Sequence, residues 1–157
     1  MTKQKSKDLV IVRIFDAPRK LVWRAWTEPA HFKKWWGPKE FSCPTAKMDV
    51  RVGGKYHWAM RAADGNEHWS AGVYREVTPM DRLVYTSSFA DAKGNLVPAT
   101  HYGMPDTIPM EMLVRVEFEN EGSKTKMTIT HSGLPTDIAA GATVGWNSSL
   151  DKLAESL

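Results

Sequence analysis

Histidine is the residue type in this sequence best suited to acid–base or metal chemistry near neutral pH. It occurs five times, as His31, His57, His68, His101 and His131. None belongs to a His-Glu-x-x-His segment or lies near a cysteine pair, which are the usual patterns of zinc sites. We therefore predict no metal site and no cofactor. His131 ends the last predicted strand, where we expect it to form a local hydrogen bond.

A hydrolytic or cyclising enzyme needs a nucleophile with a base, or paired carboxylates, brought to one place. The sequence contains no motif of this kind, so we assign no catalytic residue. His101, in a long polar segment, is the best acid–base candidate, but a solvent-exposed loop histidine is the more ordinary interpretation. Cys43 is the single cysteine, which excludes an internal disulfide, and we interpret it as structural. An enzyme that uses a polar group of a cavity stays an alternative hypothesis.

Charge gives little indication of a partner. The net charge is +3, and acidic residues are interspersed with basic ones, whereas nucleic-acid binders usually carry a concentrated basic stripe. No apolar run is long enough for a signal peptide or a membrane span. We therefore expect a cytoplasmic protein, a monomer or a homodimer, that binds neither nucleic acid nor membranes.

Aromatic and thioether side chains are the unusual part of the composition, with seven Trp and eight Met. Such side chains can fill an irregular core, which is the commoner use, or line a pocket for apolar ligands. Both interpretations require elements that bring distant residues to one place.

The segment 135–157 is the clearest of these elements. Its apolar residues recur at steps of three and four and predict an amphipathic helix that packs on a partner surface: Ile138, Ala142, Trp146, Leu150, Leu153 and Leu157. Gly141 and Gly145 each cost a helix interior about 1 kcal/mol relative to Ala, so we expect another part of the chain to approach the backbone there.

The rest of the chain predicts one strand, two short helices and a sheet. Residues 9–15 are rich in Val and Ile, and Pro18 and Pro29 are typical of helix starts. From Met48 to Ile129 the apolar period changes to two, which predicts about six further antiparallel strands. We expect a single domain over residues 8–157 and a flexible tail at residues 1–7. The polar connection 91–109 is either a lid or binding loop, or disordered.

The hairpin at Asp64-Gly65 gives the sharpest prediction of strand register, because this dipeptide favours a two-residue turn. Such a turn places Met60 opposite Trp69, Trp58 opposite Ala71 and Tyr56 opposite Val73. We take these six residues to form the inner face of the sheet. A slip of one residue would invert this pattern.

Several short motifs together resemble one known family. They are Ala17-Pro18, the run from Val22 to Thr27, Trp35-Trp36-Gly37-Pro38, the run from Asp49 to Gly54, and Gly145-Trp146 with Leu150, Leu153 and Ala154. The chain resembles the activators of the ninety-kilodalton heat-shock protein's ATPase, within the START-like (SRPBCC) superfamily. The resemblance implies an α+β helix-grip fold, in which a curved antiparallel sheet wraps around a long C-terminal helix, with two short helices near the N-terminus. It also implies a mainly apolar cavity.

Function follows less directly from this resemblance, because the superfamily includes lipid carriers, hormone receptors, cyclases and chaperone regulators. Our leading hypothesis is binding of a small apolar or amphipathic molecule, lipid-like or an aromatic metabolite. A chaperone partner, with a role in the stress response, is an alternative. The predicted ligand-binding residues are Trp36, Trp58, Met60, Trp69, Tyr85, Phe89, Met112, Trp146 and Leu150.

Overall fold

The structure, a computed structural model, describes residues 8–157, so the tail predicted at residues 1–7 lies outside the described residues. Seven antiparallel strands form one sheet in the order β1-β7-β6-β5-β4-β3-β2. In chain order the elements are β1 (Leu9–Phe15), α1 (Arg19–Thr27), α2 (Pro29–Phe32), β2 (Ser42–Met48), β3 (Lys55–Arg61), β4 (Glu67–Thr78), β5 (Arg82–Ala90), the 3₁₀ helix η1 (Ala99–Tyr102), β6 (Met112–Glu121), β7 (Lys124–Ser132) and α3 (Thr136–Ser156).

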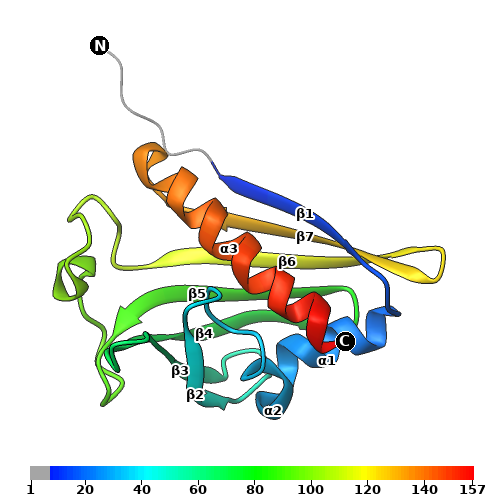
Figure 1. The fold of residues 1–157 in the computed structure, drawn as a ribbon, viewed down its shortest axis with the longest axis horizontal. Coiled ribbons are helices and arrows are strands. Elements are labelled where there is room, and N and C mark those ends of the chain that lie inside the picture. Colours follow the sequence, from blue (N-terminus) through cyan, green and yellow to red (C-terminus); the bar gives the residue numbers. More distant parts are fainter. Residues whose placement is uncertain (1–7) are drawn as a thin grey trace.

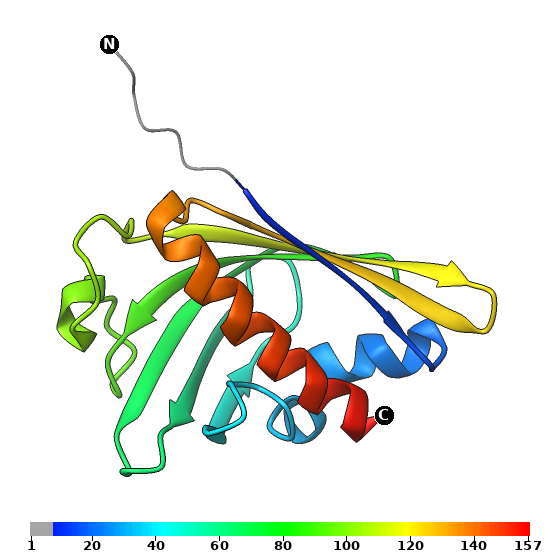
Figure 2. The ribbon, with the colours of Figure 1, turned by 45° about the horizontal axis from the view of Figure 1, so that its top comes forward.

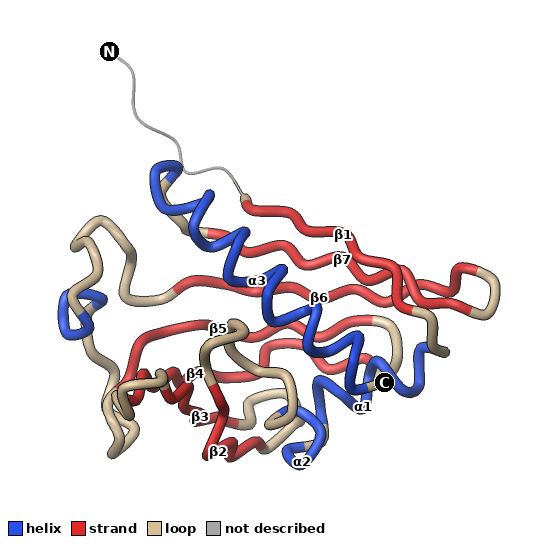
Figure 3. Tube along the Cα trace, in the orientation of Figure 1, coloured by secondary structure: helices blue, strands red, loops and turns tan. Residues whose placement is uncertain are grey.

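The sheet curls around α3, which crosses one of its faces obliquely (Figures 1 and 2). The helices α1 and α2 lie near the C-terminal end of α3, and the connection between β5 and β6 lies at the opposite end of the molecule (Figure 3). This is the helix-grip arrangement that the sequence predicts. The first strand and both short helices are confirmed, and the sheet contains six further strands. The first of these six, β2, begins at Ser42 and not near Met48.

The helix α3 turns the predicted apolar stripe toward the sheet and buries it in part. Leu150 and Leu153 are fully buried in the main core, and Trp146 packs against it. The interpretation of Gly141 was wrong, because a Cβ added there would meet no atom within 4 Å. A Cβ at Gly145 would lie 3.9 Å from Cγ of Pro38, which is an ordinary van der Waals contact.

The hairpin register differs from the prediction by one residue. Its loop has three residues, because the backbone N–H of Ala62 donates to the carbonyl of Asn66, and Gly65 adopts a positive φ of 89°. This is the alternative hairpin loop, a type I turn followed by a left-handed glycine. The observed pairs are Tyr56 with Gly72, Trp58 with Ser70 and Met60 with His68.

The slip moves Trp69 to the outer face of the sheet, away from Trp58. There its ring stacks on His57 with centroids 4.4 Å apart. The inner face of β4 instead presents the small residues Ser70 and Gly72 opposite the aromatic residues of β3. A one-residue slip has this effect because side chains alternate between the two faces of a strand.

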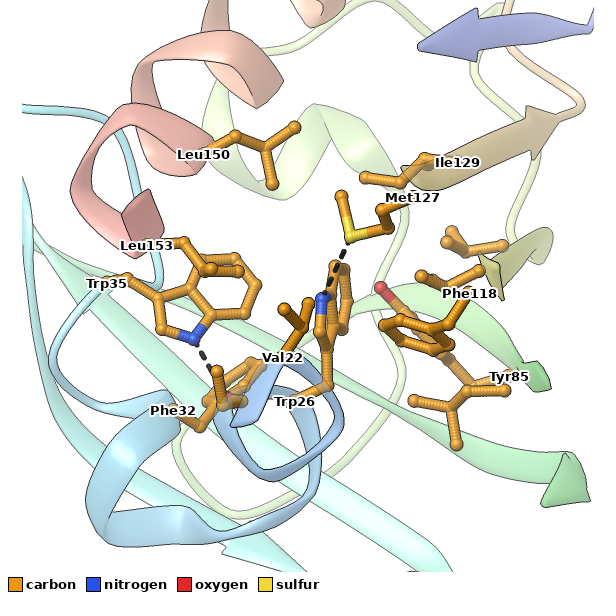
Figure 4. Packing of buried hydrophobic residues seen from close by; sticks show 14 of the residues in the cluster. Val22, Trp26, Phe32, Trp35, Tyr85, Phe118, Met127, Ile129, Leu150 and Leu153 are labelled. Atoms are coloured by element: carbon orange, nitrogen blue, oxygen red, sulfur yellow. Dashed lines mark hydrogen bonds between the residues drawn. The ribbon is translucent and has the colours of Figure 1, made fainter. Parts of the chain in front are cut away.

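Trp26 of α1 and Trp35 of the turn after α2 lie at the centre of the core (Figure 4). The indole Nε1 of Trp26 donates to Sδ of Met127 over 3.3 Å, and Nε1 of Trp35 donates to the carbonyl of Ala25 over 2.8 Å. Both rings are buried and their polar atoms are paired. Trp35 is therefore structural, whereas its neighbour Trp36 has a different environment.

The long connection between β5 and β6 is folded onto the end of the sheet. Its residues Ala99 and Ile108 form a second buried cluster with Met112 and Leu134. The hydroxyl of Tyr102 donates to the carbonyl of Ala90 and accepts from the backbone N–H of Trp69, over 3.1 Å in the second case. These contacts attach the connection to β4 and β5.

Candidate functional site

A cavity of about 210 Å³ lies between the inner face of the sheet and α3. The strands β3 and β5 contribute large aromatic rings, α3 contributes Trp146, and the turn after α2 contributes Trp36. The sheet and the helix also contribute small residues to the wall, and their short side chains leave the space open: Ser70 and Ser87 on the sheet, and Ala142, Gly145 and Ser149 on α3.

The wall includes five of the nine predicted binding residues: Trp36, Trp58, Met60, Tyr85 and Trp146. The other four lie elsewhere. Trp69 is on the outer face, and Leu150 is buried in the core beneath α3. Met112 belongs to the second cluster, and Phe89 packs against that cluster.

Aromatic contacts run continuously along this wall. The ring of Tyr56 stacks on Trp58 with centroids 3.8 Å apart, Trp58 lies 5.0 Å from Trp36, and Trp36 lies 5.6 Å from Trp146. The Tyr56 ring lies against Gly72, where a Cβ would come within 2.7 Å of it. Gly72 is therefore needed for this ring to lie flat on the sheet.

His131 is the main residue of the cavity that the sequence prediction missed. It lies on the inner face of β7, and its Nδ1 accepts a hydrogen bond of 3.1 Å from Nε1 of Trp146. The partner thus belongs to α3, and the prediction of a local bond was wrong. Burial lowers the pKa of His131 to about 4, so the imidazole is neutral at physiological pH.

The cavity is electrically neutral. Its wall contains no lysine, arginine or carboxylate, and burial raises the pKa of the Tyr56 and Tyr85 hydroxyls well above the usual value. The hydroxyl of Tyr56 donates to the carbonyl of Thr86 over 2.5 Å. The hydroxyl of Tyr85 and the indole nitrogens of Trp36 and Trp58 are buried without a hydrogen-bond partner among the described residues.

The turn 37–41 forms the rim of the cavity and is attached to α3 at two points. Nζ of Lys152 donates to the carbonyls of Gly37 and Phe41 over 3.0 and 2.9 Å, with a longer contact of 3.4 Å to that of Pro38. The backbone N–H of Lys39 donates to Oγ of Ser148 over 2.7 Å. These bonds fix the distance between the rim and the helix.

A second, wider hollow of about 560 Å³ lies over the outer face of the sheet. Its border includes the exposed residues Lys47, Lys55, Leu96 and Glu111. Charges of both signs surround it, as is usual for a solvated surface. The inner cavity, with its apolar aromatic wall, is the better candidate for a binding site.

The remaining histidines do not converge. His101 is exposed on η1 and lines neither hollow, and His57 and His68 lie on opposite faces of the hairpin. His57 forms a 2.9 Å hydrogen bond with the carbonyl of Asp91. Within residues 8–157, no three side chains of histidine, cysteine, aspartate or glutamate form a group that could hold a metal ion. Across the same residues, no helix has the length and apolar character needed to span a membrane.

Comparison with known proteins gives a family and a set of similar folds. The family model described as "Activator of Hsp90 ATPase homolog 1-like protein" matches residues 16–157. No curated protein matches the chain significantly. A crystal structure from Chromobacterium violaceum is 29% identical, with a TM-score of 0.78 and 94% of each chain covered.

Two further structures are similar. A Nitrosomonas europaea protein is 28% identical, with a TM-score of 0.77, covering 96% of this chain and 93% of its own. The AHSA1 protein from Silicibacter pomeroyi is 23% identical, with a TM-score of 0.76, covering 95% of this chain and 96% of its own, and it shows the shared fold alone.

Proposed function

The chain belongs to the activator of Hsp90 ATPase homolog 1-like family, and we propose that it binds a small apolar or amphipathic molecule, lipid-like or aromatic, between the sheet and α3. The observation that carries this proposal is the 210 Å³ cavity with its aromatic wall. Concave sites with a mainly apolar, aromatic wall and a few polar groups are where proteins usually bind small molecules, and this cavity has such a wall.

The size and polarity of the cavity support a small ligand. An apolar cavity of about 150 Å³ accepts benzene in a well-studied protein, so this one has room for one or two fused rings or a short acyl chain. Each methylene that leaves water for such a site contributes about 0.8 kcal/mol. A neutral wall offers no counter-ion, so a charged group of the ligand would remain at the rim.

The arrangement of polar groups favours binding over catalysis. His131 bonds to an indole nitrogen, and among the described residues no serine of the wall bonds to it. Its pKa of about 4 also makes it a weak base near pH 7. A cyclase or hydrolase would need a nucleophile and a base in contact, so we place the enzyme hypothesis behind the binding hypothesis.

A native mass spectrometry screen with apolar and amphipathic compounds tests the proposal. We expect complexes of one ligand per chain that weaken strongly in a Trp146→Ala variant, which loses part of the wall. Trp23→Ala is the matched control, because Trp23 packs against Phe118 and does not line the cavity. If no compound binds the wild-type protein, or if both variants bind equally well, the proposal is wrong.

Regulation of a chaperone's ATPase is a second candidate function, favoured by the family description and by an exposed apolar stripe on β1. The stripe consists of Val10, Val12 and Ile14, each more than half exposed on an edge strand. We would measure the ATPase rate of an Hsp90-type chaperone with saturating protein, and compare the wild type with Val12→Lys. An unchanged rate with the wild-type protein would exclude this role. For either function we propose a cytoplasmic monomer or homodimer.

A further inference from the structure

The polar atoms around the cavity differ in whether a ligand can reach them. The indole nitrogens of Trp36 and Trp58 are closed off from water, so they do not face the space. The hydroxyls of Ser70 and Ser149 also have no hydrogen-bond partner among the described residues, but they are not closed off in this way. Because both serines line the cavity, their oxygens are open to a molecule that occupies it.

Ser149 belongs to the wall that α3 contributes. A serine or threonine inside a helix commonly bonds to the backbone carbonyl one turn before it. Thr143 of the same helix does so, since its Oγ1 donates to the carbonyl of Ala139 over 2.8 Å. Ser149 is only 5% exposed and forms no such bond to the described carbonyl of Gly145. Its hydroxyl is therefore left for the cavity.

Ser70 belongs to the opposite wall, on the sheet. It pairs with Trp58 of β3, and paired residues of neighbouring strands carry their side chains on the same face. Ser70 therefore lies on the inner face beside the buried Trp58 ring. The third serine of the wall, Ser87, interacts with the hydroxyl of Tyr56, so we do not count it as free. One free hydroxyl thus faces the 210 Å³ space from each layer.

From this arrangement we infer that the cavity takes an uncharged ring compound with a hydroxyl group, a phenol or a ring alcohol, and that this hydroxyl lies between Ser70 and Ser149. The inference rests on the proposed function and narrows its ligand class. A hydroxyl both donates and accepts, so the ligand can accept from one serine and donate to the other.

Other classes of ligand fit the two serines less well. A hydrocarbon of the same shape leaves both hydroxyls unpaired, and an ether oxygen accepts from them but cannot donate. A carboxylate or an ammonium group enters a wall that has no lysine, arginine, aspartate or glutamate to balance its charge. The neutral hydroxyl is the group that uses both serines and needs no counter-ion.

Equilibrium dialysis at pH 7 with four naphthalene derivatives tests the inference: 2-naphthol, 2-methoxynaphthalene, 2-methylnaphthalene and 2-naphthoate. 2-Naphthol is uncharged at this pH, because phenols titrate near about pH 10. We expect the wild-type protein to bind it about tenfold more tightly than 2-methylnaphthalene, as one additional buried hydrogen bond predicts. The ether and the carboxylate should both bind more weakly than 2-naphthol.

The outcomes separate this inference from the proposed function. Equal affinity for 2-naphthol and 2-methylnaphthalene would overturn the inference and leave the proposed function standing. An ether or a carboxylate that binds as tightly as 2-naphthol would also overturn it. If none of the four compounds binds the wild-type protein, the proposed function fails for ring compounds and the inference fails with it.

Substitution of the serines assigns the contacts. Ser70→Ala and Ser149→Ala each remove one hydroxyl with little change in volume, so we expect the preference for 2-naphthol over 2-methylnaphthalene to fall to about threefold in each and to about one in the double variant. Ser88→Ala is the matched control, because Ser88 is buried on β5 but does not line the cavity. A full preference in the double variant, or an equal loss in the control, would overturn the assignment.

Discussion

Two glycines of α3 allow the packing of the helix to be separated from the role of the cavity. Gly141 and Gly145 are one turn apart, and both lie in the helix interior. A Cβ at Gly141 would meet nothing within 4 Å, and one at Gly145 would meet only Pro38, at 3.9 Å. The two positions differ in that Gly145 lines the cavity and Gly141 does not.

Alanine at either position should stabilise the protein by about 1 kcal/mol, because glycine in a helix interior loses more backbone entropy on folding than alanine does. For a chain of this size, 1 kcal/mol corresponds to a rise in Tm of about 2–4 °C. The stabilisation should be similar for Gly141→Ala and Gly145→Ala, since neither methyl group meets a close contact.

Ligand binding should distinguish the two variants. The methyl group of Gly145→Ala would lie between α3 and Pro38, at the rim of a cavity of about 210 Å³, so we expect affinity to fall several-fold. Gly141→Ala should bind like the wild type. Thermal unfolding followed by circular dichroism, and titration with a compound from the ligand screen, measure the two effects.

The results that would refute this reasoning are specific. A lower Tm for Gly145→Ala would mean that the helix packs more tightly on the rim than the 3.9 Å contact indicates. An equal loss of affinity in both variants would mean that helix rigidity, and not space in the cavity, controls binding.

Three further predictions follow from buried polar groups. The folded pKa of His131 is about 4, below the unfolded value of 6.5, so the unfolded state binds more protons between these two pH values. The free energy of unfolding should therefore fall as pH drops from 6.5 to 4, by at most about 1.4 kcal/mol per pH unit. Urea unfolding at a series of pH values should show a weaker dependence of stability on pH for His131→Gln. Burial raises the pKa of Cys43 to about 11, so an aromatic disulfide reagent at pH 8 should modify it slowly in the native protein and rapidly in denaturant. Lys152→Met removes the hydrogen bonds to the carbonyls of the turn 37–41. We expect the free energy of unfolding, measured in urea, to fall by about 1 kcal/mol and the amides of that turn to exchange faster. Unchanged amide exchange would contradict the role of Lys152 in holding the rim.

Patterns that depend on one element alone were predictable from the sequence. The strand Leu9–Phe15, the helix starts near Pro18 and Pro29, and the apolar stripe of the C-terminal helix all appear in the structure. These features follow from local preferences and from one buried face. The family motifs then supplied the arrangement of the elements, which no local pattern contains.

The error in the hairpin arose because Asp64-Gly65 fits two loops. It can be the whole of a two-residue turn, or the end of a three-residue loop with Gly65 in the left-handed conformation. The apolar pattern favoured the first, since Trp69 would then face inward. Trp69 is instead covered on the outer face, where His57 stacks on it and Tyr102 of the long connection bonds to its backbone. That cover comes from a segment about thirty residues away, so the hairpin sequence could not reveal it.

The register of this hairpin also decides which side chains of β4 face the cavity. In the predicted register Trp69 would lie on the inner face opposite Met60, with Ala71 opposite Trp58. In the observed register His68 lies opposite Met60 and Ser70 lies opposite Trp58, and Ser70 lines the cavity together with Ser87 of β5. These small side chains lie across from Ala142, Gly145 and Ser149 of α3. Small residues of both layers thus line a cavity that is bordered by Trp36, Trp58 and Trp146. An inward Trp69 would bring an indole ring opposite Met60, where His68 now lies, so the three-residue loop determines which side chains of β4 border the binding site.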